Sequence, residues 1–143
     1  MVTLLAATLF MSGGCRPATQ TFFPAEGVLL VNGEPVANAC IAFHPVPEGE
    51  DARYPVGRTD AAGRFRLSTE SGSYGAPSGD YVVTIVWVDE SGDECKCAEP
   101  LKHDLLQGHY ADPKLSGIRV TVRPTDENVY RFHARRLPDR PPL

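Results

Sequence analysis

The chain has 143 residues, a formal net charge of −4 and a hydrophobic fraction of 42%. This length fits one domain with short tails, and the apolar content is sufficient for a core. The acidic balance argues against a nucleic-acid binder, which usually carries a concentrated basic patch. Gly and Pro each occur 13 times, which favours many turns over long helices.

The N-terminal region carries an apolar run over residues 2–11. Spanning a bilayer takes about 20 residues, whereas the apolar part of a secretory signal peptide takes only ~7–15. Ser12, Gly13, Gly14 and Cys15 follow this run, and the small residues before the cysteine resemble a bacterial lipobox. The sequence therefore predicts a signal peptide over residues 1–14 and lipidation of Cys15. Ser12 stands where Leu is usual, and a plain secretory signal is the alternative.

Lipidation of Cys15 would decide where the protein resides. Residues 15–25 are expected to form the lipidated end and a tether, so that acyl chains, and no spanning helix, hold the chain on a membrane. By resemblance to other lipoproteins, Arg16 in place of Asp permits sorting to the outer membrane of a two-membrane cell. We therefore expect an exported, membrane-anchored lipoprotein, periplasmic or on the cell surface.

Seven segments are predicted to be short strands, because their apolar residues alternate and turn residues bound them. They are residues 27–31, 39–44, 56–59, 64–69, 80–88, 118–123 and 128–134. The segment 80–88 is apolar on both faces and is expected to be a central strand. Seven strands of this kind predict a single antiparallel β-sandwich over residues 26–134.

The connections between these strands are also predicted from the residues. Asn32-Gly33 is a strong hairpin signal, and Pro35 suits an edge. Residues 70–79 are rich in Gly and Ser and are expected to form a loop too polar for the core. A long loop is expected between residues 89 and 116, and a Pro-rich, disordered tail over residues 135–143.

Several of these residues carry a family resemblance. The stretch from Gly27 through Asn32-Gly33-Glu34-Pro35-Val36 to Pro45, then Thr59-Asp60 with Gly63, then Gly79 with Tyr81, resembles the carboxypeptidase regulatory-like domain, a transthyretin-like (prealbumin-like) sandwich. With Tyr110-Ala-Asp-Pro113, Ser116 and Asn128, the layout is similar to small lipoproteins abundant in planctomycete bacteria. These motifs are mostly turn chemistry, so the resemblance implies the fold more strongly than a function.

The long loop holds the best candidates for chemistry. Cys95, Cys97, His103 and His109 are natural ligands for zinc or copper, and His44 is expected near the same end. The alternative is a disulfide among Cys40, Cys95 and Cys97, an odd set that leaves one thiol over. We favour the disulfide or inert thiols, because a flexible loop alone supplies no closed ligand shell. The acidic run Asp89, Glu90, Asp93 and Glu94 is interpreted as solvated loop in preference to a calcium site.

Catalytic motifs are missing from the sequence. It contains neither a Gly-x-Ser-x-Gly elbow nor a His-Glu-x-x-His pair. Hydroxyisourate hydrolase shares the broader fold but ends in Tyr-Arg-Gly-Ser, whereas this chain ends Asp139-Arg-Pro-Pro-Leu143.

The sequence therefore favours a non-enzymatic envelope module for binding, adhesion or scaffolding, with a protein or glycan partner. An exposed sheet edge is one way to bind a partner strand. A metal-binding surface protein is the alternative, and a hydrolase is the least favoured hypothesis.

Overall fold

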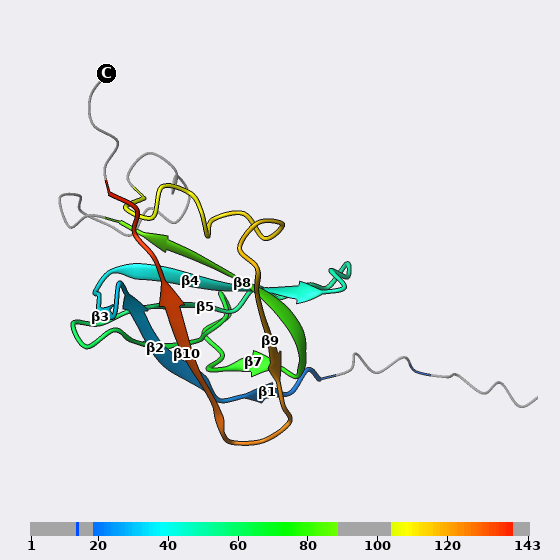
Figure 1. The fold of residues 1–143 in the computed structure, drawn as a ribbon. Helices are drawn as coiled ribbons and strands as arrows, with labels where there is room; N and C mark the ends of the chain where they lie inside the picture. Colours follow the sequence, from blue (N-terminus) through cyan, green and yellow to red (C-terminus); the bar gives the residue numbers. More distant parts are fainter. Residues whose placement is uncertain (1–13, 15–18, 89–103, 139–143) are drawn as a thin grey trace, which may run out of the picture.

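The computed structural model describes Gly14, residues 19–88 and residues 104–138 (Figure 1). Within these ranges it contains ten strands and no helix, which confirms the predicted all-β class. The strands are β1 (Phe22–Phe23), β2 (Ala25–Val31), β3 (Glu34–Pro35), β4 (Ala39–Val46), β5 (Val56–Arg58), β6 (Arg64–Arg66), β7 (Ala76–Pro77), β8 (Gly79–Trp87), β9 (Ile118–Val122) and β10 (Asn128–Ala134). Each of the seven segments predicted as strands overlaps one of these. Cys15 lies outside the described residues.

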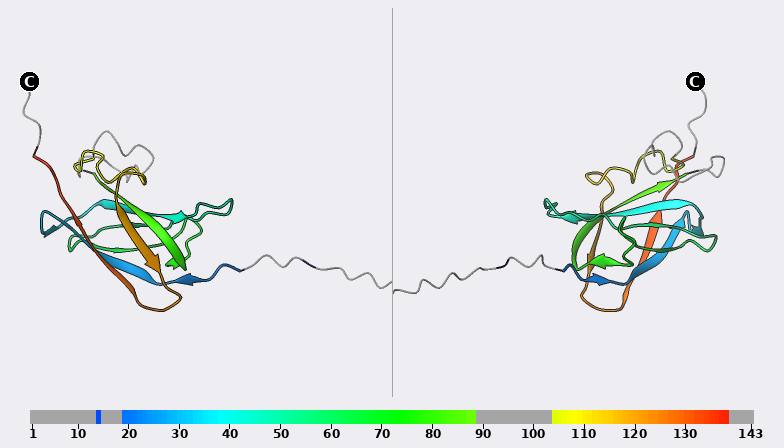
Figure 2. Two further views of the ribbon diagram at one scale, coloured as in Figure 1. Left: turned by 45° about the vertical axis from the view of Figure 1, so that its right-hand side comes forward. Right: turned by 180° about the vertical axis from the view of Figure 1, so that it is seen from behind.

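Two four-stranded sheets face each other in a sandwich-like arrangement (Figures 1 and 2). One has the order β5-β4-β8-β9. In the other, the order is β10-β2-β3, and β6 also pairs with β2. A bridge between Val56 and Ser68 links β5 of the first sheet to the segment just after β6 of the other. Strands β1 and β7 form a small separate pair.

Alternating apolar side chains fill the space between the sheets. Strand β4 buries Ala39, Ile41 and Phe43 completely, while the residues between them lie on the outer face. Strand β8 is buried on both faces and pairs with β4 on one side and β9 on the other, which confirms its predicted central position.

Five rings form an aromatic cluster across the core. Its members are Phe43, Phe65, Tyr81, Tyr130 and Phe132. The ring centroid of Phe43 lies 5.5 Å from that of Tyr130 and 6.3 Å from that of Phe132. Phe132 in turn stacks on Phe65 at 5.7 Å. The cluster therefore connects β4 and β8 of one sheet with β6 and β10 of the other.

The hairpin between β2 and β3 is as predicted. Asn32 and Gly33 adopt φ of 51° and 83°, the left-handed values that a two-residue turn of this kind needs. Val31 pairs with Glu34 and Leu30 with Pro35, so Pro35 lies in a short edge strand. The Pro35 prediction is therefore also confirmed.

The prediction of purely antiparallel sheets is wrong. Strand β10 runs parallel to β2 over the whole register from Asn128 opposite Ala25 to Ala134 opposite Val31 (Figure 1). The reason lies in the turn at residues 123–127, which carries the chain from β9 in one sheet to β10 in the other. Because β10 is no hairpin partner of β9, it enters beside β2 and in the same direction.

Two segments outside the predicted strands contact the rest of the domain. Strand β1 lies inside the predicted tether and pairs with β7, whose Ala76 is fully buried although residues 70–79 were predicted to be too polar for the core. This pairing depends on Gly75, which has φ of +95° and whose added Cβ would lie 2.2 Å from the carbonyl oxygen of Phe23. At the other end, Arg136 N donates to Asn32 Oδ1 at 3.1 Å, so residue 136 contacts the turn after β2.

One buried side chain, Asn128, holds the turn before β10. Its Nδ2 lies 3.1 Å from the carbonyl oxygens of both Pro24 and Arg123 and 3.2 Å from that of Thr125. Its Oδ1 accepts a hydrogen bond from Arg123 N at 2.8 Å. One amide thus contacts four backbone groups, with the two Nδ2 hydrogens shared among three carbonyls, and it ties the start of β10 to the end of β9 and to the chain before β2.

We predict that Asn128→Ala lowers the free energy of unfolding by about 2–4 kcal/mol, because several backbone groups lose their partner at once. Denaturant unfolding monitored by tryptophan fluorescence measures this. The matched control is Glu127→Ala at the exposed neighbouring position, for which we expect a change within about 0.5 kcal/mol. Equal effects of the two substitutions would refute the structural role of Asn128.

Candidate functional site

The predicted metal and disulfide residues lie mostly outside the described part of the chain. This holds for Cys95, Cys97 and His103, whereas His109 is described and exposed. Cys40 is half-buried on the outer face of β4, in register between Arg58 and Val86. Within residues 19–88 and 104–138, no three His, Cys, Asp or Glu side chains are grouped so as to hold a metal. The metal and disulfide hypotheses both stay predictions.

The described end of the long loop is a structural element. Asp104, which is 9% exposed, accepts hydrogen bonds from the backbone N–H groups of Trp87, Leu106 and Gly108 at 2.9–3.0 Å. These contacts place Leu106 in the core, where it is 1% exposed. Residues 105 and 106 form turns and no helix. The carboxylate of Asp104 is therefore engaged in holding the loop against β8.

His44 is also engaged within the fold. Its Nε2 lies 2.9 Å from Thr84 Oγ1, and its ring packs edge-on against Tyr54 with centroids 5.7 Å apart. Burial lowers the pKa of His44 below its usual 6.5, and the nearby carboxylate of Glu48 opposes this shift. A neutral imidazole is therefore favoured in the folded state.

The outer face of the sheet that contains β2 is unusually rich in arginine, and we call it the arginine face. Its residues are Glu26, Val28 and Leu30 on β2, Arg64 and Arg66 on β6, and Val129, Arg131 and His133 on β10. The register arranges them in rows across the strands: Arg66, Glu26 and Val129 form one, and Arg64, Val28 and Arg131 form the next. A shallow hollow of about 700 Å³ lies over this face.

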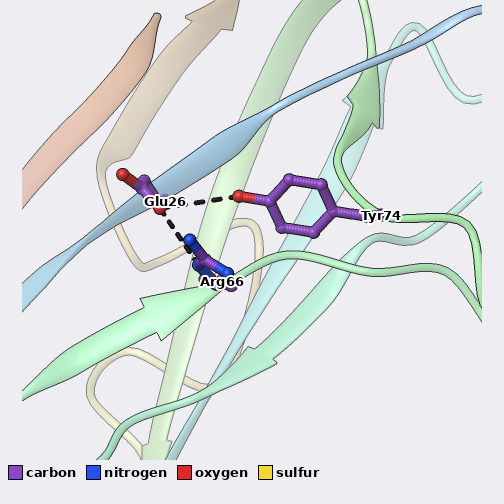
Figure 3. Close-up of polar contacts among 3 residues, drawn as sticks. All are labelled: Glu26, Arg66 and Tyr74. Carbon is purple, nitrogen blue, oxygen red and sulfur yellow. Dashed lines mark hydrogen bonds and ion pairs between the residues drawn. The ribbon is translucent and has the colours of Figure 1, made fainter.

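Glu26 is the one carboxylate of the arginine face, and it is paired with an arginine of the same face. Glu26 Oε2 lies 3.2 Å from Arg66 Nε and 3.5 Å from the Tyr74 hydroxyl, and the Arg66 guanidinium lies 5.4 Å from the centre of the Tyr74 ring (Figure 3). The Arg66 and Glu26 side chains are 73% and 44% exposed, so this contact contributes little stability. Among the described residues, no carboxylate forms an ion pair with Arg64 or Arg131.

The outer edge of β10 presents backbone groups to solvent. The carbonyl of Ala134 accepts a hydrogen bond from Asn32 N next to β2, so the backbone groups of residues 128, 130, 132 and 134 face β2. By alternation, the N–H and C=O groups of Val129, Arg131 and His133 face outward. No strand of the described chain pairs with them. Val129 is also 72% exposed.

A groove separates this edge from β9. It has a volume of about 500 Å³ and a mixed lining. The apolar part comes from Ile118, Val120, Val129, Tyr130 and Phe132, and Arg119, Arg131 and His133 also line it. At one end Tyr130 Oη donates to Thr121 O at 2.9 Å, and at the other Arg135 N donates to Tyr110 Oη at 3.1 Å. The two strands separate as they leave the turn at residues 123–127 (Figures 1 and 2). Hydrogen bonds therefore connect the two sides of the groove at both of its ends.

The sequence alone does not reveal this edge. Alternation within residues 128–134 shows which side chains point inward, but it says nothing about which strand lies next to β10. The exposed valine at position 129 was the available signal, since apolar β-branched side chains are uncommon on solvent-facing edges.

Comparisons with other proteins identify no family. A scan of known protein families found no match, and searches of curated proteins and of solved structures also found none. Within the described ranges there is no helix with the length and apolar character needed to cross a membrane.

We predict that His44→Asn reduces the loss of stability on acidification. The pKa of His44 is lowered in the folded state, so the unfolded chain binds the proton more readily, and the wild type loses stability as the pH falls through about 6.5 and toward the folded-state value. One such group contributes at most about 1.4 kcal/mol per pH unit. Urea unfolding at several values between pH 8 and pH 5 gives the slope. An unchanged slope in the variant would contradict this role.

Proposed function

We propose that the chain is a non-enzymatic cell-envelope lipoprotein, exported and anchored through Cys15, that binds an extended segment of a partner protein along the outer edge of β10. The domain would be a transthyretin-like sandwich of the carboxypeptidase regulatory-like type. The observation that carries the binding proposal is the outward-facing backbone of Val129, Arg131 and His133 beside an open groove.

The chemistry of strand addition supports this function. An added strand gains main-chain hydrogen bonds from the edge, and alternate side chains enter the pockets beside it. The groove lined by Ile118, Val120 and Tyr130 would receive one set of side chains, and the arginine face lies next to the other set. The described polar side chains with the most internal contacts, Asp104 and Asn128, are both engaged in hydrogen bonds to backbone groups.

The anchoring part of the proposal predicts the fate of the protein in a two-membrane bacterium. We expect the wild type in the outer-membrane fraction with a diacylglycerol adduct by mass spectrometry, and Cys15→Ser in the soluble fraction without the adduct. Arg16→Asp keeps the adduct and tests the sorting step alone, since we expect it in the inner membrane. Membrane recovery of Cys15→Ser equal to that of the wild type would refute the lipid anchor.

The binding part predicts that a proline on the edge of β10 blocks the partner strand. Val129→Pro removes an outward N–H at a position where proline is tolerated, because that N–H has no partner in the sheet. Val129→Thr keeps both the N–H and the branched shape and is the matched control.

Peptides of random sequence displayed on phage, selected on the wild-type domain, provide the ligands. We expect their affinity to fall at least about tenfold in Val129→Pro and to change less than about twofold in Val129→Thr. Thermal unfolding checks that both variants remain folded. Equal binding to both variants, or no selectable peptide, would overturn the proposed function.

A further inference from the structure

Acidic side chains in the partner would complement the arginine face. The chain has a net charge of −4, yet the arginine face carries Arg64, Arg66 and Arg131 against Glu26 alone, and Arg58 and Asp60 line the hollow beside them. Glu26 is paired with Arg66, and Asp60 accepts hydrogen bonds from the N–H groups of its own turn at 2.9 Å. The excess of positive charge is therefore local.

The row that crosses the centre of the face has one arginine on each side of Val28 of β2. Arg64 of β6 lies opposite Val28 on one side, and Arg131 of β10 lies opposite it on the other. Their backbones are two strand spacings apart, about 10 Å. A strand added outside β10 would place every second side chain beside Val129, Arg131 and His133 on this face.

We infer that the β10 edge selects an extended segment that alternates apolar and acidic residues. This inference rests on the proposed strand addition and adds the chemistry of the partner. The acidic side chains would lie on the arginine face, where a carboxylate beside Arg131 forms a charge-assisted hydrogen bond. The apolar side chains would enter the groove between β9 and β10, against Ile118 and Val120. Opposite charges directly across neighbouring strands stabilise a pair, and like charges destabilise it.

A second copy of the chain fits this edge poorly. Two β10 strands pairing antiparallel around a twofold axis overlap most fully when the axis passes through the middle of the three outward residues. In that register Arg131 of one copy would lie opposite Arg131 of the other, which places like charges together. A charged side chain at the centre of an open edge is a common protection against self-pairing. The complementary occupant is therefore an acidic strand.

Synthetic peptides about as long as β10, which has seven residues, test this inference. One alternates Val and Glu, a second has Gln in place of Glu, and a third is the Val–Glu peptide with alternate backbone nitrogens methylated. Fluorescence anisotropy at about 0.15 M salt measures their affinities for the folded domain. We expect the Glu peptide to bind about tenfold more tightly than the Gln peptide, and the methylated peptide to bind much more weakly than its parent.

Charge variants locate the effect. In Arg131→Gln combined with Arg64→Gln, we expect the preference for Glu over Gln to fall to about twofold or less. Arg53→Gln removes the same kind of charge from an exposed loop position and should leave the preference unchanged. Thermal unfolding of each variant confirms that the domain remains intact.

The outcomes separate this inference from the proposed function. Equal affinity for the Glu and Gln peptides, with both lost in Val129→Pro, would overturn the acidic preference and leave strand addition standing. Full binding of the methylated peptide would refute strand pairing itself. Binding to anionic lipid vesicles that depends on Arg64 and Arg131 but not on the β10 backbone, with no peptide preference, would point to a membrane surface and overturn the inference.

Discussion

The contact between Phe43 and the rings of β10 determines how the rest of the molecule is arranged. Phe43 is completely buried, and its ring lies 5.5 Å from Tyr130 and 6.3 Å from Phe132. Aromatic side chains bury about 150–250 Å² each, so these rings account for much of the apolar surface between the sheets. They hold β10 across the core from β4. Its only strand partner in the described chain is β2, and its other edge faces the groove.

An open strand edge can bind a partner, but it also exposes the protein to unwanted strand pairing. Unpaired backbone groups invite pairing with any exposed strand, and proteins often limit this with charge. Here Arg131 lies at the centre of the edge and Val129, 72% exposed, near its start. The combination opposes pairing with a second copy and leaves the edge suited to a strand of opposite charge. Specificity would then come from Arg131 in two ways: it repels the same arginine of a second copy, and it attracts an acidic side chain of the partner strand.

The sequence predicted the strands well because each depends on local information. Phe65 and Leu67 alternate with polar residues, and Asn32-Gly33 allows the positive φ of the hairpin. The β1–β7 pair was missed because it depends on the close approach of Gly75 to Phe23, residues distant in sequence. The parallel pairing and the open edge were missed for the same reason: alternation gives the face of a side chain but not the neighbour of a strand. The metal and disulfide roles of the loop cysteines remain predictions.

Amide hydrogen exchange at β10 is the most direct test of strand addition. Two-dimensional NMR spectra report the exchange rates of the Val129, Arg131 and His133 amides individually, with and without a saturating Val–Glu peptide. We predict that these outward N–H groups exchange rapidly in the domain alone and at least about tenfold more slowly in the complex, because each gains a main-chain acceptor. The outward amide of Arg119 on β9 should not change. Saturation by the peptide with unchanged exchange at all three β10 amides, or protection at Arg119 instead, would contradict binding at this edge.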